Sequence, residues 1–184
     1  MTDVDIRIIL KNTLLKNYYE CSNSKVVEEL ELPVAKARID MAVINGYMHG
    51  FEIKSASDTL KRIPSQVEAY TKVFDYLSIV TEEKYCNKLL TMTPKWVGII
   101  ICSKDGETTL IRKALINKKK QSFFLAKLLW KDELQILLAN SGVKFNKSDR
   151  SWLLCEALAK KFTVKEVSEL VREQLRLRAN WKDC

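Results

Sequence analysis

Histidine is nearly absent from this chain, since His49 is the only one in 184 residues. A Ser-His-Asp or Cys-His site would need His49 as its base, yet His49 lies in a stretch that reads as a β-hairpin. A structural zinc site needs clustered cysteine or histidine ligands, which the sequence lacks. These absences argue against the common nucleophilic hydrolases and against zinc modules.

Paired cysteines and long apolar runs are also missing. The five cysteines are scattered without a CxxC pair, which favours free thiols in a reducing compartment. The longest apolar runs, such as Val97–Cys102, are far shorter than the roughly 20 residues that span a bilayer. The N-terminus carries acids rather than a basic stretch before an apolar segment. We therefore expect an intracellular, cytoplasmic protein without a membrane segment. The cysteines are Cys21, Cys86, Cys102, Cys155 and Cys184.

An excess of charge of one sign is confined to the second part of the chain. Residues 1–103 hold 13 Lys and Arg against 13 Asp and Glu, whereas residues 104–184 hold 18 against 10 and account for the whole net charge of +8. A neutral first part and a basic second part indicate a catalytic body with an extension that binds a polyanion. The alternative is that the second part has solvated helix faces that happen to be basic.

Hydrophobic periodicity predicts strands and helices in alternation before residue 119. Asn45-Gly46 is a typical turn between two hairpin strands, and Pro64 suits the first turn of a helix. The predicted elements are a helix at 4–19, strands at 25–32, 38–44 and 47–55, a helix at 64–75, and strands at 76–81, 95–103 and 108–112. The apolar stripe of the first helix comprises Ile6, Ile9, Leu10, Leu14 and Tyr18.

The pattern after Lys118 is helical and basic. Helices are predicted at 121–140, 149–161 and 163–178, with Gly142 placed to end the first. The third opens on Thr163 and Glu166, which have the spacing of a capping box. Helices on the faces of a sheet would bury the apolar strands. We therefore predict an α/β core at 1–118 and a basic helical subdomain at 119–184.

Three charged residues stand on the two predicted hairpin strands: Asp40, Glu52 and Lys54. Strand side chains alternate between faces, so Glu52 and Lys54 share one face. A strict two-residue turn would pair Asp40 with Phe51 and turn it away from Glu52. A three-residue loop, or one bulge near Gly50, pairs Asp40 with Glu52 instead. We predict this second register.

Two close carboxylates repel each other unless one takes up a proton or a cation neutralises them. With oxygen ligands alone, that cation should be Mg²⁺ or Mn²⁺. Such an ion can activate water and polarise a phosphoryl oxygen, and Lys54 beside it can orient the water or stabilise developing charge. The set suffices for phosphodiester hydrolysis. The alternative is a surface salt bridge on an exposed hairpin face.

Gln66 and Tyr70 lie four residues apart on the following predicted helix and therefore share one face. Core packing for Tyr70 and solvation for Gln66 are the alternatives. The combination Asp40…Glu52-Ile53-Lys54…Gln66-x-x-x-Tyr70 resembles the PD-(D/E)XK nuclease superfamily, in particular its RecB-like branch. Residues 4–103 also resemble a group of small uncharacterised bacterial proteins in that superfamily.

The resemblance implies a restriction-endonuclease-like core, with a mixed sheet flanked by helices in the order α-β-β-β-α-β, and here a C-terminal helical extension. It implies that Asp40, Glu52 and the backbone carbonyl of Ile53 bind the metal. Lys54 would be the catalytic lysine, with Gln66 and Tyr70 beside the site.

Superfamily members often add one more acid from the first helix or strand. Glu29 is our choice, and Glu20, Glu28 and Glu31 stay open. The proline that names the superfamily is replaced by Ile39, a common departure.

Nucleic acid is the expected partner, with DNA favoured. Lys61 and Arg62 would lie near the mouth of the cleft beside Asp58 and could grip flanking phosphates. A polar loop with a helix cap at Asp58 is the alternative. A homodimer or a protein partner stays open. The full predicted nucleic-acid-binding set is Arg38, Lys61, Arg62, Lys118, Lys119 and Lys120.

The sequence therefore predicts a Mg²⁺- or Mn²⁺-dependent nuclease. The alternative is a catalytically idle nuclease fold that serves as a DNA-binding or scaffolding subunit in a repair or phage-defence complex. A third hypothesis is a regulator that binds DNA through its helical tail.

Overall fold

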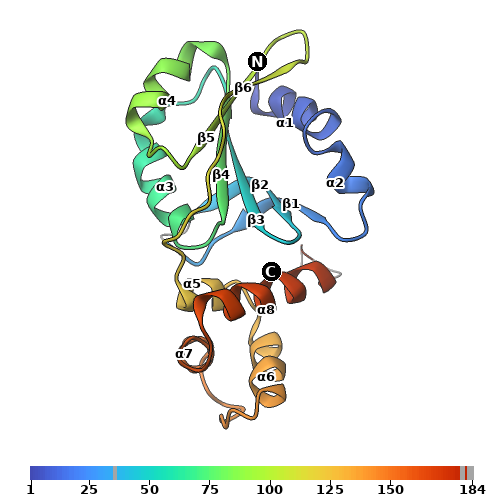
Figure 1. The fold of residues 1–184 in the computed structure, drawn as a ribbon, viewed down its shortest axis with the longest axis vertical. Coiled ribbons are helices and arrows are strands. Elements are labelled where there is room, and N and C mark those ends of the chain that lie inside the picture. The colour runs from blue at the N-terminus through green and yellow to red at the C-terminus, as the bar shows by residue number, and fades with distance from the viewer. Residues whose placement is uncertain (35–36, 179–180, 182–184) are drawn as a thin grey trace.

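A computed structural model describes residues 1–34, 37–178 and 181. Its centre is a mixed six-stranded sheet in the order β1-β2-β3-β4-β5-β6 (Figure 1). The central strands β3, β4 and β5 run parallel to one another, and the remaining neighbours are antiparallel. The strands are β1 (Lys25–Glu31), β2 (Arg38–Ile44), β3 (Met48–Lys54), β4 (Tyr76–Thr81), β5 (Gly98–Cys102) and β6 (Thr108–Arg112).

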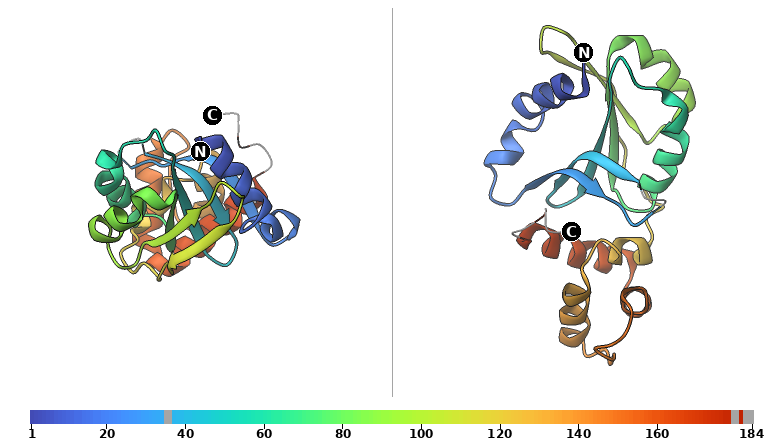
Figure 2. Two further views of the ribbon diagram at one scale, coloured as in Figure 1. Left: turned by 90° about the horizontal axis from the view of Figure 1, so that it is seen from above. Right: turned by 180° about the vertical axis from the view of Figure 1, so that it is seen from behind.

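Helices cover both faces of this sheet, as the opposite views in Figures 1 and 2 show. Two helices, α1 (Asp3–Asn12) and α2 (Lys16–Glu20), lie on one side, and α3 (Ile63–Thr71) and α4 (Cys86–Met92) lie on the other. Alternate strand residues serve the two sides: Met41 packs in the cluster with α1, and its neighbour Ala42 packs in the cluster with α3. Because the strands are covered on both faces, both sets of alternating side chains are apolar, and the strand sequences are nearly continuous apolar runs.

The first predicted helix is wrong in one respect, because it breaks between α1 and α2. Thr13 caps α1, and the amide of Leu15 reaches back to Leu10 O at 2.9 Å. This break turns Leu15 into the core in place of Leu14, which is 41% exposed, and it also leaves Tyr18 exposed. The sequence analysis also missed α4, which connects β4 to β5.

The predicted helix at 121–140 is also divided, into α5 (Ser122–Ala126) and α6 (Lys131–Asn140). Trp130 has an extended backbone between them, and its amide donates to Glu133 Oε2 at 2.7 Å. Gly142 ends α6 with φ of +67°, as predicted. The last helices are α7 (Ser151–Lys161) and α8 (Val164–Leu177), and α8 opens on the predicted capping box of Thr163 and Glu166.

The helical tail, α5 to α8, lies at one end of the sheet (Figure 1). Leu125, Leu154 and Val167 of the tail belong to the same apolar cluster as Val27 and Leu30 of β1. The tail therefore helps to complete the core of the body. Buried ion pairs join Asp75 after α3 to Lys120 before α5, and Glu133 of α6 to Arg178 after α8.

The structure also bears on membrane-spanning segments and on the state of the cysteines. Within the described part of the chain, no helix is long and apolar enough to cross a membrane. Cys21, Cys86, Cys102 and Cys155 are free, and Cys184 lies outside the described residues.

Candidate active site

The hairpin of β2 and β3 has the predicted register. Met41 lies opposite Phe51 and Ile44 opposite Met48, so three residues, 45–47, form the loop. The loop is closed because Asn45 N donates to Tyr47 O, and Tyr47 N donates to the Asn45 side chain. Continuing the pairing by one residue brings Asp40 opposite Glu52 on the same face of the sheet.

Asp40 sits where β2 meets the end of β3. Its Oδ2 accepts a hydrogen bond from Ile53 N at 2.7 Å. Burial raises the pKa of the Asp40 carboxyl from 3.8 to about 7, the charge of Glu52 adds to this, and the bond from Ile53 partly opposes it. The negative charge of Glu52 thus acts on Asp40, which is what two neighbouring carboxylates are expected to show.

Glu52 is only 2% exposed and is held by three donors. Its Oε1 accepts from Lys54 Nζ at 2.5 Å and from Gln66 Nε2 at 2.6 Å, and its Oε2 accepts from Tyr70 OH at 2.6 Å. Burial, together with the charge of Glu52, raises the pKa of Tyr70, so the hydroxyl keeps its proton for this bond. The hydroxyl also lies 2.9 Å from Arg38 O, which joins α3 to the start of β2.

These side chains border an open cavity of about 1020 Å³. Six acidic and four basic side chains line it, so the cavity carries a surplus of negative charge. The acidic lining residues are Asp3, Glu29, Glu31, Asp40, Glu52 and Asp58, and the basic ones are Arg7, Arg38, Lys54 and Arg62.

The candidate additional acids are placed unequally. Glu29 lies level with Asp40, because Glu28 pairs with Met41 and Leu30 pairs with Ile39 on either side. Glu31 also borders the cavity, whereas Glu28 and Glu20 are not among its lining residues.

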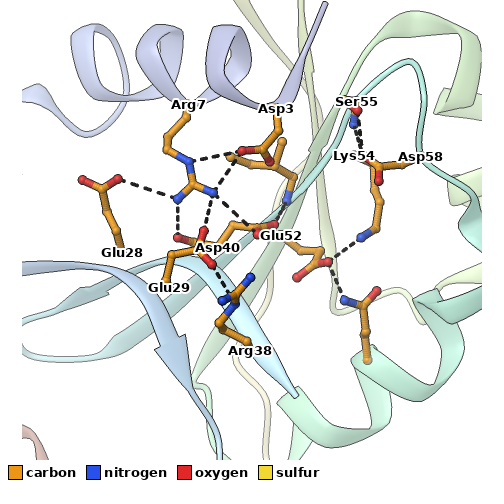
Figure 3. A network of polar contacts seen from close by, with 12 residues as sticks. Asp3, Arg7, Glu28, Glu29, Arg38, Asp40, Glu52, Lys54, Ser55 and Asp58 are labelled. Atoms are coloured by element: carbon orange, nitrogen blue, oxygen red, sulfur yellow. Dashed lines mark hydrogen bonds and ion pairs between the residues drawn. The ribbon is translucent and has the colours of Figure 1, made fainter. Parts of the chain in front are cut away.

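Sequence reasoning missed Asp3 and Arg7 of α1, both of which line the cavity (Figure 3). Arg7 Nη1 donates to Asp40 O at 2.8 Å, and Arg7 Nη2 lies 3.1 Å from Asp3 Oδ1. No sequence signal gave this contact, because it depends on how α1 lies over the sheet.

The donor chemistry at Asp40 and Glu52 suits a hard divalent cation, because carboxylate and carbonyl oxygens are its preferred ligands. Within residues 1–34, 37–178 and 181, no three His, Cys, Asp or Glu side chains are arranged as a metal site. The oxygens of Glu52 are engaged by Lys54, Gln66 and Tyr70. A cation at Asp40 would therefore have to exchange with one of these donors.

The candidate phosphate-binding residues of the body differ in position. Arg38 and Arg62 line the cavity, whereas Lys61 is exposed outside it. Arg38 is also paired with Glu29, its Nε lying 2.7 Å from Glu29 Oε2. Asp58 does not cap a helix; its Oδ2 instead accepts from Ser55 N at 2.8 Å and from Ser55 Oγ at 2.7 Å, which closes the turn after β3.

The predicted nucleic-acid-binding role of the lysine run 118–120 requires exposed side chains, and Lys120 does not meet this requirement. Lys118 and Lys119 are exposed, but the Lys120 side chain is 12% exposed and its ammonium pairs with Asp75 and donates to Ser168 Oγ. The reason is that α8 closes over this segment. Lys120 joins tail to body and is not available to a phosphate.

Comparison with known proteins gives one matching family, one similar curated protein and one similar solved structure. The family described as bacteriophage P4 protein cII matches residues 2–183. Protein cII of Enterobacteria phage P4 is 27% identical over 175 residues, which cover 93% of this chain and 65% of that relative's length. Among solved structures, a protein of unknown function from Silicibacter pomeroyi has a TM-score of 0.50 and 14% identity, covering 81% of this chain and 98% of that one. This last likeness concerns the fold alone.

Proposed function

We propose that this chain, which belongs to the bacteriophage P4 protein cII family, is a metal-dependent nuclease that hydrolyses phosphodiester bonds, with DNA as the favoured substrate. The proposal assigns the mixed sheet and its flanking helices to the restriction-endonuclease-like fold of the PD-(D/E)XK superfamily. None of the three descriptions of similar proteins names an activity. The support for the proposal is therefore the site itself.

One observation carries the proposal: Asp40, Glu52 and Lys54, from two neighbouring strands, meet at one cavity beside Gln66 and Tyr70. Burying Glu52 and Lys54 and half burying Asp40 carries a desolvation cost, and clusters of this kind are common at functional sites. A surface salt bridge, the alternative, does not fit Glu52 and Lys54, which are 2% and 4% exposed.

Each side chain has a part in this proposal. Asp40, Glu52 and the carbonyl of Ile53 would hold Mg²⁺ or Mn²⁺. When bound, the ion would lower the pKa of a coordinated water and polarise a phosphoryl oxygen. Lys54, 2.5 Å from Glu52 Oε1, would then orient that water or stabilise charge on the phosphate. Tyr70 would keep Glu52 in place through its 2.6 Å hydrogen bond.

Substrate binding would use the basic side chains that remain free to reach a phosphate. Arg62 lines the cavity, and Lys61, Lys118 and Lys119 are exposed. The basic excess after residue 103 supports a contribution from the tail. We place this activity in the cytoplasm, which the free cysteines favour.

One observation favours the second candidate, a catalytically idle DNA-binding or scaffolding subunit. The carboxylate of Glu52 accepts hydrogen bonds from Lys54, Gln66 and Tyr70, so its charge is compensated without a metal ion. This candidate predicts DNA binding without cleavage.

A cleavage assay separates the two candidates. The protein is incubated with plasmid and with linear DNA in Mn²⁺ or in EDTA. The nuclease proposal expects products in Mn²⁺ only, and none from Asp40→Asn. Glu68→Gln, which removes an exposed carboxylate from α3, is the matched control and should cleave normally. DNA binding without products in Mn²⁺ would establish the second candidate instead.

A further inference from the structure

The guanidinium of Arg7 lies among the acidic side chains of the cavity, and Arg38 contacts one of these acids, Glu29, from the other side (Figure 3). Arg7 extends from α1, and its side chain is only 14% exposed. Its Nη2 lies 2.6 Å from Glu29 Oε1 and 3.7 Å from Asp40 Oδ1. The same group pairs with Asp3 at 3.1 Å and with Glu28 at 3.7 Å. Four carboxylates from α1, β1 and β2 therefore surround one permanent cation.

The backbone of β1 is bent to bring two of these carboxylates together. Regular alternation would put Glu28 and Glu29 on opposite faces. Glu29 has φ of +55°, a left-handed conformation that is rare for a side chain of this kind. Val27 and Leu30 are consequently both buried, and both glutamates reach Arg7. The strained backbone at Glu29 therefore lets two carboxylates, Glu28 and Glu29, contact the guanidinium of Arg7.

Arg7 cannot easily leave this position. It lies on α1 between Ile6 and Leu10, and both of these are fully buried against the sheet. Arg7 Nη1 also donates to the main-chain oxygen of Asp40 at 2.8 Å, so the guanidinium bridges helix and strand. Because arginine does not lose its proton, the charge is present at every accessible pH.

We propose that Arg7 acts as a built-in cation that keeps a divalent ion out of the space between Asp40 and Glu29, so that the active site is limited to the one ion held by Asp40 and Glu52. This inference rests on the proposed function for the meaning of that site. Removing the guanidinium of Arg7 takes away the cation that Asp3, Glu29 and Asp40 share and leaves Arg38, which pairs with Glu29, as the remaining basic side chain beside them. Clustered carboxylates without a counter-charge bind a hard cation or take up protons.

Calorimetric titration of the full chain with Mn²⁺ tests the inference by counting ions. Arg7→Gln should bind one ion more than the wild type, and Arg7→Lys, which keeps a positive charge, should bind the wild-type number. Lys11→Gln is the matched control, because Lys11 is also on α1 and pairs with Glu28 at 2.5 Å, away from Asp40. It should also bind the wild-type number.

The inference is overturned if Arg7→Gln binds the wild-type number of ions, or if Lys11→Gln gains an ion as well. Should Arg7→Gln not fold, Arg7→Gln combined with Glu28→Gln removes one charge of each sign. That double variant retains Asp3, Glu29 and Asp40 and should gain the same extra ion; a count equal to the wild type overturns the inference.

The proposed function is judged separately by the wild-type count. One ion in the wild type and two in Arg7→Gln supports both statements. No ion in the wild type and one in Arg7→Gln supports the role of Arg7 and contradicts the metal-dependent nuclease.

Discussion

Replacing Asp40 by asparagine should stabilise the metal-free protein at alkaline pH. Burial and the charge of Glu52 raise the pKa of Asp40 from 3.8 to about 7. Between these values the native state keeps a proton that the unfolded state has lost, so the free energy of unfolding falls as pH rises through this window. Asparagine does not titrate, and its side-chain oxygen can still accept the hydrogen bond from Ile53 N.

The magnitude follows from the shift, since each pKa unit corresponds to about 1.4 kcal/mol. The titration of Asp40 should lower the free energy of unfolding by about 2 kcal/mol at pH 5 and by about 4 kcal/mol at pH 8. The advantage of Asp40→Asn should therefore grow by about 2 kcal/mol between these pH values. His49, whose pKa burial lowers to about 4, is present in both proteins, so its titration cancels in the difference.

Urea unfolding in EDTA, followed by circular dichroism at pH 5 and pH 8, measures this difference. Adding Mn²⁺ at pH 8 should narrow it, because an ion held by Asp40 and Glu52 stabilises only the wild type. An advantage that stays constant with pH would refute the raised pKa of Asp40, and with it the burial of this carboxyl beside Glu52.

Three further experiments concern Tyr70, Lys120 and the exposed lysines of the tail. Tyr70→Phe removes the donor to Glu52 Oε2. The free energy of unfolding should fall by about 1–3 kcal/mol, and Mn²⁺-dependent cleavage should be lost. Wild-type values in urea unfolding and in single-turnover cleavage would rule out a role of Tyr70 in holding Glu52. Lys120→Met removes the ammonium that pairs with the buried Asp75 and leaves the more distant Arg172, at 3.9 Å, so the free energy of unfolding should fall by about 2 kcal/mol. Lys119→Met, on the exposed neighbour, should change it by less than about 0.5 kcal/mol. Equal effects of the two variants in urea unfolding would contradict the contact between tail and body. Charge reversal at Lys118 and Lys119 should reduce the slope of the logarithm of the DNA-binding constant against the logarithm of salt concentration by about 0.9 per lost phosphate contact. An unchanged slope, measured by fluorescence anisotropy, would make the tail a structural element only.

Local patterns were sufficient to predict the strands and the hairpin that carry the site. A strand has a period of two, so the faces of Asp40, Glu52 and Lys54 depend only on the loop length, and 45–47 proved to be a three-residue loop. Helix spacing predicted that Gln66 and Tyr70 share one face of α3, and the family resemblance implied that this face lies beside the site, where both residues contact Glu52.

Contacts between distant segments could not be predicted. Asp3 and Arg7 reach the cavity because α1 lies across the end of β2, and no local rule gives that placement. Glu29, which has a positive φ, contacts Arg7 through the same placement of α1. Lys120 looked like part of an exposed run, but the docking of α8 buries it against Asp75. The helix breaks near Leu15 and Trp130 likewise satisfy packing that the apolar pattern alone does not reveal.

The central claim is that Asp40, Glu52 and Lys54 form a metal-dependent active site. Single-turnover cleavage of end-labelled DNA in Mn²⁺, measured together with DNA affinity by fluorescence anisotropy, tests it most directly with the wild type and Lys54→Ala. The account predicts that Lys54→Ala lowers the cleavage rate by about a hundredfold or more and leaves the dissociation constant nearly unchanged. A wild type that binds DNA and yields no products in Mn²⁺, or a Lys54→Ala variant that cleaves at the wild-type rate, would contradict the claim.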